Sequence, residues 1–361
     1  MNDALRRDGA AALSDWYRTH NRPLPWRQSP TPYRVWVSEI MLQQTRIEAV
    51  LPYYERFMAR LPDVPSLAAA PEDVLLKLWE GLGYYSRVRN LQRAAQILCR
   101  DYGGELPADY DALLALPGIG DYTAGAIASI AFGIPVPAVD GNGMRVMSRL
   151  CCDETDVLSA GAKRHYAALF REMLPADEPG RFNQAVMELG ETVCLPGANP
   201  QCAQCPLHFM CAAYAAGRQG ELPVRIKRQT RRVEERSVQI IIGGTPGERR
   251  VLLHRRPDTG LLAGLWELPN RLSDEAASLP VQPLSPPTQL PSGKHLFSHV
   301  EWRMVGELYY CFGLPPLPQG YCWVSLAELQ RKIALPSAFR TYTALLPSLL
   351  NGEEYPSGSK K

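Results

Sequence analysis

The spacing of apolar positions divides the chain into a helical region and a strand-rich region. Up to about residue 216, apolar residues recur every three or four positions between short turns rich in proline and glycine, as in Val35–Arg60 and Val74–Leu82. From Val233 onward, runs of β-branched and aromatic residues alternate with turn signals such as Pro246-Gly247. These strand-like runs are Ser237–Gly243, Val251–Arg255 and Val305–Phe312. The pattern therefore predicts helices first and a sheet-containing domain afterwards.

A basic segment lies between the two regions. Residues 225–236 contain six arginine and lysine residues against two glutamates. Two interpretations remain open: a solvated linker, or a linker that also contacts DNA phosphates. We place this linker at residues 217–236. Further on, the proline-rich stretch Leu279–Pro291 predicts a loop, and residues 351–361 predict a flexible tail.

Length, charge and cysteine content narrow the class of protein. The 361 residues are enough for two or three domains with buried cores. The net charge of +2 does not mark the whole chain as nucleic-acid binding, so a DNA-binding face must come from local clustering. Nine cysteines, four of them close together, favour a reducing compartment. Because the N-terminus lacks the apolar core of a signal peptide and no apolar run reaches the roughly 18 residues of a membrane span, we expect a cytoplasmic protein without a membrane partner.

Four cysteines form a close cluster with the spacing C-x7-C-x2-C-x5-C: Cys194, Cys202, Cys205 and Cys211. Thiolates in short loops hold zinc or an iron–sulfur cluster. A zinc ribbon usually has two C-x-x-C pairs, and here only Cys202 and Cys205 form one. The spacing therefore favours an iron–sulfur cluster and leaves zinc as the alternative.

A glycine-rich turn precedes an expected helix in Leu116–Ala124, LPGIGDYTA. Gly118 and Gly120 permit a tight backbone, and successive N–H groups before a helix can bind a phosphate. The preceding segment, Asp111–Leu116, has a helical pattern, and we expect the next helix to start at Thr123, so the unit predicts a helix–hairpin–helix. A G-x-G turn before a helix is common, so this turn does not establish DNA binding by itself.

Further motifs follow one another along the chain: Leu24–Trp26, Pro32–Glu39, Met41–Thr45, Gly81–Tyr85, Val139–Asn142 and Arg181–Ala185. Over residues 13 to about 216, the sequence resembles the helix–hairpin–helix DNA glycosylases of the endonuclease III-like superfamily. Within it, the sequence is similar to the adenine DNA glycosylases, which remove adenine mispaired with 8-oxoguanine. The resemblance implies an all-α glycosylase fold, with a six-helix barrel over about residues 27–130 and a cluster domain from residues 1–26 and 131–216. It also implies a 4Fe–4S cluster on the four cysteines, although the family most often has six residues in the first gap and this chain has seven.

The C-terminal region resembles the Nudix-like domain of the same family. The similarity rests on Val251–Pro269 and Leu296–His299, and it implies an α+β domain over residues 237–350. A hydrolytic Nudix domain needs an R-E-x-x-E-E run to hold Mg²⁺, and Asn270 to Lys294 contains none. We therefore expect no nucleotide hydrolysis.

The resemblance also implies the catalytic residues. Release of adenine requires protonation of the base and stabilisation of the sugar cation. Glu39 matches the acid that protonates adenine at N7 with a raised pKa, and Asp140 matches the carboxylate that stays ionised and faces the sugar. Taken alone, each acid is more typical of a surface or helix-capping residue. Tyr122 stands where bifunctional relatives have a lysine, and a phenol cannot form their Schiff base; the alternative is a tyrosine packed at a helix start. Asn142 is expected to hydrogen-bond near Asp140.

The remaining matches concern DNA and base contacts. Gln44 and Tyr84 match residues inserted beside the base left unpaired when adenine is flipped out. The side chains expected to contact 8-oxoguanine are Phe297, Ser298 and His299, although Phe297 and His299 are also typical of core and turn residues. The candidates for reading the adenine edge are Arg27, Gln184 and Glu188, of which Glu188 fits a surface carboxylate equally well. Gly143 stands where relatives commonly have valine, so we expect looser packing beneath Asp140.

These observations predict a monofunctional, monomeric adenine DNA glycosylase that acts on 8-oxoguanine:A and G:A mispairs in double-stranded DNA and leaves an abasic site. It would be cytoplasmic and associated with the nucleoid when bound to DNA. Two alternatives remain: a glycosylase of the same fold for another base, and a non-catalytic DNA-binding protein that contains a cluster.

Overall fold

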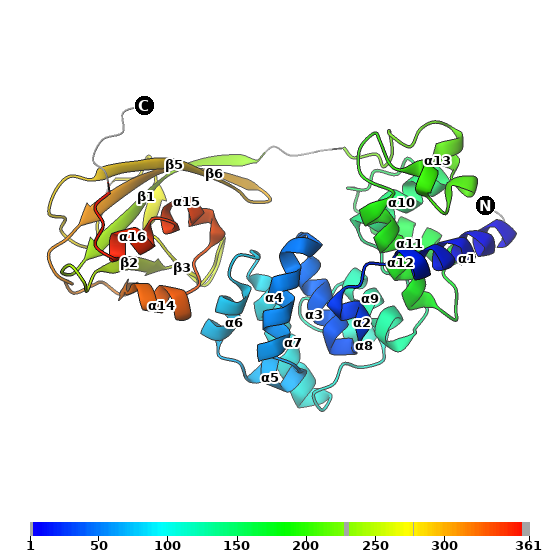
Figure 1. The fold of residues 1–361 in the computed structure, drawn as a ribbon, viewed down its shortest axis with the longest axis horizontal. Helices are drawn as coiled ribbons and strands as arrows, with labels where there is room; N and C mark the ends of the chain where they lie inside the picture. Colours follow the sequence, from blue (N-terminus) through cyan, green and yellow to red (C-terminus); the bar gives the residue numbers. More distant parts are fainter. Residues whose placement is uncertain (1–2, 227–230, 277, 356–361) are drawn as a thin grey trace. The chain divides into compact units, whose positions relative to one another are not determined.

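The structure, a computed structural model, describes residues 3–226, 231–276 and 278–355. Its contacts divide the chain into two compact units: Met1–Ala69 with Arg89–Arg228, and Ala70–Val88 with Gln229–Lys361. Residues 227–230 of the expected linker and residues 356–361 of the expected tail lie outside the described residues. One unit is built from helices and the other around a sheet (Figure 1).

Throughout its described residues, the first unit contains helices and no strand. The α-helices are α1 (Asp3–His20), α2 (Pro25–Gln28), α3 (Pro32–Leu42), α4 (Ile47–Arg60), α5 (Val64–Ala69), α7 (Ser86–Asp101, which begins in the second unit), α8 (Tyr110–Leu114), α9 (Asp121–Phe132), α10 (Gly141–Cys151), α11 (Ala162–Met173), α12 (Pro179–Thr192) and α13 (Ala212–Ala215). The expected all-α region is confirmed. No helix in the described ranges is long and apolar enough to cross a membrane.

Helix α9 packs against α3, α8 and α12. Its residues Thr123–Ser129 are buried and mostly small, which allows neighbouring backbones to approach closely. A Cβ added at Gly125 would lie 2.4 Å from the Pro137 carbonyl oxygen, and one at Gly180 of α12 would lie 2.5 Å from the Ser129 carbonyl oxygen. These approaches hold α9 against α12 and against the segment that leads into α10, and all three carry candidate site residues.

Two helices are present where the sequence pattern predicts one. The pattern over Val35–Arg60 predicts a continuous helix, but α3 ends at Leu42 and α4 begins at Ile47. Between them, Gln44 has the left-handed φ of 57°, which a right-handed helix does not accommodate. The apolar spacing continues across the break, so periodicity does not reveal it.

The second unit contains one mixed sheet of seven strands within the described ranges (Figure 1). The strands are β1 (Arg232–Gly243), β2 (Arg250–Arg255), β3 (Trp266–Glu267), β4 (Asn270–Leu272), β5 (Thr288–Leu296), β6 (Val300–Tyr310) and β7 (Tyr321–Val324). The order is β3-β2-β1-β6-β5, with β4 paired to β1 and β7 to β2. Strands β1 and β6 run parallel, and the other pairs are antiparallel. The α-helices of this unit are α6 (Glu72–Trp79), α14 (Leu326–Arg331), α15 (Arg340–Thr343) and α16 (Leu346–Leu350).

Alternation along β1 sends its side chains to two faces of the sheet. Val238 and Ile240 belong to a core that also contains Trp302 and apolar residues of α14, α15 and α16. Ile241 belongs to a smaller cluster that contains Tyr309. The expected sheet-containing domain is therefore confirmed, with helices covering one face.

The three expected strand-like runs are strands, with shifted ends. Strand β6 ends at Tyr310 rather than Phe312. Strand β1 begins at Arg232, within the segment expected to be a linker. The prediction of a loop over Leu279–Pro291 is wrong for its last residues, because β5 begins at Thr288. Because sheet ladders use backbone groups, polar or proline-containing segments at strand ends give little sequence signal.

The close packing of α9 against α12 generates a stability prediction. Gly180→Ala should lower the free energy of unfolding by about 2 kcal/mol, because the new Cβ has no room beside α9. Chemical unfolding followed by circular dichroism measures the change. Gly161→Ala, where a Cβ meets nothing within 4 Å, is the matched control. Equal effects in the two variants would contradict the packing argument.

Candidate functional site

The carboxyl of Glu39 is buried on α3. Tyr122, in the first turn of α9, donates a hydrogen bond from Oη to Glu39 Oε2 at 2.6 Å. Burial raises the pKa of Glu39 to about 7; the charge of Asp140 adds to this rise, while the Tyr122 hydrogen bond and Arg27 oppose it. Burial also raises the pKa of Tyr122 well above its ordinary value, so the phenol keeps its proton. The site therefore holds a carboxyl that can be neutral near neutral pH.

Asp140 is the N-cap of α10 and has a different environment. Its Oδ1 accepts a hydrogen bond from the Gly143 N–H at 2.7 Å. Burial raises the pKa of Asp140 and the charge of Glu191 adds to this rise; the N–H groups of Gly143 and Asn142 and the charge of Arg145 lower the pKa, but the net shift is upward. The partial positive charge at the start of a helix acts in the same direction as these donors. The helix start thus stabilises the ionised carboxylate and offsets part of the effect of burial.

The side chain of Asn142 bonds to neighbours of Asp140. Its Nδ2 donates to Glu191 Oε1 at 2.6 Å, and its Oδ1 accepts from Arg145 Nη2 at 3.0 Å. It is the backbone N–H of Asn142, and not its side chain, that helps to lower the pKa of Asp140.

One cleft of about 820 Å³ in the first unit brings most of these residues together. Its lining includes the candidate residues Arg27, Glu39, Gln44, Gly120, Tyr122, Asp140, Asn142, Gln184 and Glu188. They come from α2, α3, the break after α3, the N-termini of α9 and α10, and α12. A cleft of this size, with a few convergent polar groups, is typical of a small-molecule or base-binding site.

Glu188 is fully buried, so its interpretation as a surface carboxylate is wrong. Its Oε1 accepts a hydrogen bond from Arg22 Nε at 2.5 Å, and its Oε2 lies 2.7 Å from Arg27 Nη2. Burial raises the pKa of Glu188. The hydrogen bond from Arg22 and the charge of Arg27 lower it by a larger amount, so the net shift is downward. Sequence reasoning missed Arg22, which lies 166 residues from Glu188 along the chain and outside every motif.

Gln184, one turn before Glu188 on α12, also bonds within the cleft wall. Its Oε1 accepts from Tyr17 Oη at 3.2 Å, and its Nε2 donates to the Gly180 carbonyl at 3.3 Å. The Arg27 guanidinium lies 5.5 Å from the centre of the Tyr17 ring. Helix α1 therefore supports the side of the cleft formed by α12.

Helices α8 and α9 form the expected helix–hairpin–helix. Gly118 has a φ of 79°, and a Cβ there would lie 2.7 Å from Asn90 Cβ. Gly120 is extended and is the N-cap of α9. Helix α9 begins at Asp121 rather than at the expected Thr123, which places Tyr122 in its first turn. Helix α8 ends at Leu114, two residues before the expected end at Leu116.

The remaining candidates lie in the second unit. Tyr84 is exposed, and its Oη lies 3.1 Å from Ser298 Oγ. Phe297 is half-buried, with edge-on ring contacts to His295 and Trp302 at 4.5 and 4.8 Å between centroids. His299 is exposed.

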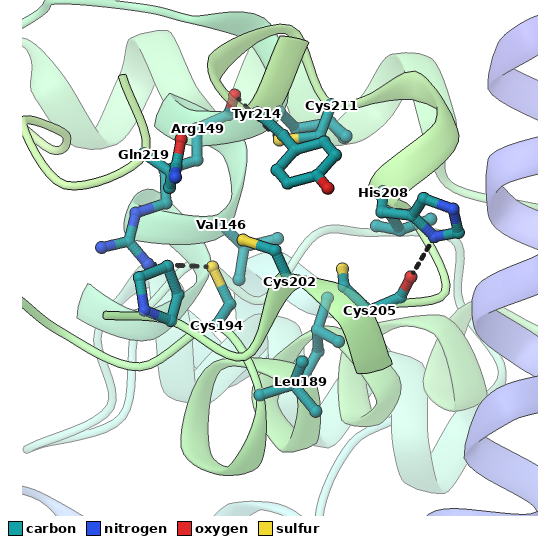
Figure 2. A pocket seen from close by; sticks show the side chains of 14 residues that line it. Val146, Arg149, Leu189, Cys194, Cys202, Cys205, His208, Cys211, Tyr214 and Gln219 are labelled. Atoms are coloured by element: carbon teal, nitrogen blue, oxygen red, sulfur yellow. Dashed lines mark hydrogen bonds between the residues drawn. The ribbon is translucent and has the colours of Figure 1, made fainter. Parts of the chain in front are cut away.

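The four cysteines line a single pocket, and Figure 2 shows their side chains arranged around it. Arg149 of α10 fastens the loop that carries the first of them. Its Nη1 donates to Cys194 Sγ at 3.3 Å and to the Leu195 carbonyl at 2.8 Å. Its Nη2 donates to the Gly197 carbonyl at 2.9 Å and its Nε to the Leu222 carbonyl at 3.0 Å.

This donor set fits a four-iron cluster. Burial raises the pKa of the Cys205 thiol to about 12, so a bound cation is needed to hold this sulfur as a thiolate. In the described ranges, no group of three His, Cys, Asp or Glu side chains is arranged to hold a metal ion. A 4Fe–4S cluster takes four cysteine thiolates, and four thiols around one pocket suit it.

Sequence reasoning missed two buried arginines, Arg145 and Arg149. Arg145 Nε donates to the Cys194 carbonyl and its Nη2 to the Gly190 carbonyl, both at 2.8 Å. The available signal was their spacing, because residues four apart on α10 share one helix face. Together they tie the helix that begins at Asp140 to the start of the cysteine loop.

The space beside Gly143, beneath Asp140, is occupied by another side chain. The prediction of looser packing there is therefore wrong. A Cβ at Gly143 would lie 2.8 Å from Cζ of Phe170, a fully buried residue of α11. The phenylalanine ring occupies the space that a larger side chain on α10 would need.

This contact predicts coupling between the two positions. Gly143→Val should destabilise the protein by about 1–3 kcal/mol through overpacking, and Phe170→Ala by about 3–5 kcal/mol through a cavity. The double variant should be more stable than the sum of the two losses by at least about 1 kcal/mol, because the valine fills part of the cavity. Chemical unfolding of the wild type, the two single variants and the double variant measures this coupling. If the two losses of stability are strictly additive, the Phe170 ring does not occupy the space of a side chain at position 143.

Both regions of the chain match known protein families. Residues 37–171 match the HhH-GPD superfamily of base excision DNA repair proteins, and residues 242–345 match the NUDIX domain. The adenine DNA glycosylase of Rattus norvegicus is 36% identical over 95% of this chain and 80% of its own length. That of Homo sapiens is 31% identical over 95% of this chain and 75% of its own length, and that of Schizosaccharomyces pombe is 31% identical over 93% and 88%.

Solved structures show the same helical fold. A thermostable thymine-DNA glycosylase matches with a TM-score of 0.54 and 26% identity, over 59% of this chain and 98% of its own. Endonuclease III, trapped as a covalent intermediate with DNA, matches with a TM-score of 0.51 and 24% identity, over 60% and 99%, and supports the fold alone. Given the long matches to curated relatives, the chain belongs to the adenine DNA glycosylase family, with a helix–hairpin–helix glycosylase region followed by a Nudix-like domain.

Proposed function

We propose that this adenine DNA glycosylase is a monofunctional monomer that excises adenine mispaired with 8-oxoguanine or guanine in double-stranded DNA. The observation that carries the proposal is the pair of carboxyls in one cleft. Glu39 is buried with a pKa of about 7, and Asp140 caps the start of α10. One group is suited to carry a proton at neutral pH and the other to carry a charge, which is how paired carboxyls divide glycoside hydrolysis.

Base release begins when Glu39 gives its proton to N7 of the flipped adenine. Protonation makes the base a better leaving group, and a general acid works best when its pKa lies near the working pH. As the bond to the base lengthens, positive charge develops on the sugar and the Asp140 carboxylate stabilises it. Water then adds to the sugar and releases a proton, which the ionised Glu39 can take back, and an abasic site remains.

Tyr122 supports the monofunctional part of the proposal. A phenol has no amine with which to form a Schiff base, the step that leads bifunctional relatives to strand cleavage. Its hydroxyl is bonded to Glu39 Oε2 at 2.6 Å, so its part is to hold the acid in place.

The cleft also offers groups for adenine recognition. Arg27 supplies a guanidinium for the base edge, and Gln184 supplies the amide proton and oxygen lone pair that its bonds to Tyr17 and Gly180 do not use. Because both oxygens of Glu188 are already engaged by arginines, Glu188 is better suited to positioning Arg27 than to contacting the base. Gln44, exposed at the break after α3, is suited to fill the gap left by the flipped base.

For the opposite base, Phe297, Ser298 and His299 form the contact loop in this proposal, with Tyr84 beside it. The Ser298 hydroxyl can bond to N7–H or O8, the groups that distinguish 8-oxoguanine from guanine. The proximity of the Tyr84 and Ser298 hydroxyls supports a shared site in the second unit.

We infer that the four cysteines, Cys194, Cys202, Cys205 and Cys211, hold a 4Fe–4S cluster. When bound, such a cluster supplies a rigid cross-link and electron-transfer chemistry, and the proposal uses only the cross-link. Arg145 and Arg149 already hold the start of this loop against α10. The cluster would order the rest of the loop for contact with DNA.

A glycosylase for another base is the second candidate, because a thymine-DNA glycosylase shares the fold. The adenine relatives are favoured because their similarity extends through the Nudix-like domain. The alternative without catalysis would require that purified, cluster-loaded protein releases no base.

The test is single-turnover reaction with a labelled duplex that carries adenine opposite 8-oxoguanine. Strand breaks should form only after alkali, faster than with adenine opposite thymine, and Asp140→Asn should bind this duplex but release adenine at least about 100-fold more slowly. Strand breaks without alkali would refute monofunctional action. Base release at the wild-type rate by Asp140→Asn would remove this carboxylate from the reaction.

The raised pKa of Glu39 sets the pH dependence. Because the neutral acid is the active form, the single-turnover rate constant should be highest below the folded-state pKa and fall as the pH rises through about 7. Glu39→Gln should be slow at every pH and lack this fall. A wild-type fall centred near 4.5, the ordinary value, would show that burial does not tune this acid.

A further inference from the structure

The end of helix α6 forms a clamp on the Nudix-like domain, and all of its contacts lie within the second compact unit. Lys77 Nζ donates to Glu80 Oε2 at 2.6 Å. It also donates to the carbonyls of Leu329 and Ile333 at 2.7 and 3.2 Å. A lysine ammonium has three protons, so these three acceptors use its full donor capacity.

Glu80 completes the clamp from the other side. Its Oε1 accepts a hydrogen bond from the Leu335 N–H at 2.8 Å. Leu329 lies near the end of α14, where helix carbonyls lack partners within the helix and attract a cation. A capping box between Ser325 and Glu328 holds the start of α14. The clamp therefore joins the end of α6 to α14 and the residues that follow it.

Short-range contacts connect α6 to Tyr84. Trp79 Nε1 donates to the Gly83 carbonyl at 3.1 Å. Arg87 Nη2 donates to the Leu82 and Gly83 carbonyls at 3.1 and 3.2 Å, and its guanidinium lies 5.7 Å from the centre of the Tyr84 ring. Tyr84 has a left-handed φ of 48°, which a tyrosine adopts only when its surroundings hold it. The turn that carries Tyr84 is thus fixed to α6.

The loop that carries Ser298 is held independently by Arg231 and Arg232, at the start of β1. Arg231 Nε donates to the Phe297 carbonyl at 3.0 Å, and the Arg232 N–H donates to the His299 carbonyl at 3.1 Å. With both segments anchored, the hydroxyls of Tyr84 and Ser298 meet at 3.1 Å although they are 214 residues apart in sequence.

We propose that Lys77 and Glu80 are positioning residues for recognition of the base opposite adenine. The clamp fixes α6, and through it Tyr84, against the domain that carries Ser298. The paired hydroxyls then present a preorganised donor and acceptor to the oxidised base. This inference rests on the proposed preference for 8-oxoguanine. Loosening the clamp separates the hydroxyls and reduces that preference, while the carboxyls in the cleft of the first unit are unchanged.

The test compares single-turnover rate constants for adenine opposite 8-oxoguanine and opposite guanine, with full-length, cluster-loaded protein. Lys77→Ala and Glu80→Ala should each lower the ratio of the two rate constants about tenfold, mainly by slowing the reaction opposite 8-oxoguanine. Glu80→Gln keeps an acceptor for the Leu335 N–H and should retain most of the ratio. Lys332→Ala, which removes an exposed lysine at the same helix end, is the matched control and should retain all of it.

A double variant distinguishes positioning from a general loss of structure. Glu80→Ala combined with Ser298→Ala should lose no more preference than Ser298→Ala alone, because both changes act on one contact. Unchanged ratios in both clamp variants would overturn the inference, as would equal slowing on the two duplexes with a lower midpoint of thermal unfolding. A wild-type ratio near one would instead refute the preference for 8-oxoguanine itself, and the inference with it.

Discussion

The hydrogen bond from Tyr122 to the buried carboxyl of Glu39 joins the two helices on which the proposed chemistry depends. It forms in a region where α9 packs closely against α3 and α12, with Gly180 of α12 lying directly against Ser129 of α9. Burial alone would favour the neutral acid strongly, and the phenol limits that effect by stabilising the ionised form. The result is an acid that can lose its proton near neutral pH.

Helix α10 connects this cleft to the cysteine loop. Its N-terminus holds Asp140, and one face further along carries Arg145 and Arg149, both bonded to the segment around Cys194. Phe170 packs against the first turn of the same helix. A single helix thus holds Asp140 at one end and the segment around Cys194 along its length, so the proposed cluster would act on the cleft through this helix as a structural cross-link.

The fold class was predictable because it depends on local patterns, and most of the candidate residues chosen from local motifs line one cleft. Periodicity separates helices from strands, and short motifs mark Glu39 and Asp140. The remaining features depend on contacts between segments that are distant in sequence, and no local pattern reveals such contacts. Arg22 meets Glu188 across 166 residues. The break at Gln44 is invisible because the apolar spacing continues through it.

Direct titration of the Glu39 carboxyl is the measurement that tests this account most sharply. Carbon-13 NMR of protein labelled at glutamate carboxyls, assigned with Glu39→Gln, gives the pKa of this group. The account predicts a midpoint near 7 in the wild type and a higher one in Tyr122→Phe, because the lost hydrogen bond favours the ionised form. A wild-type midpoint near 4.5, or one that Tyr122→Phe leaves unchanged, would contradict it.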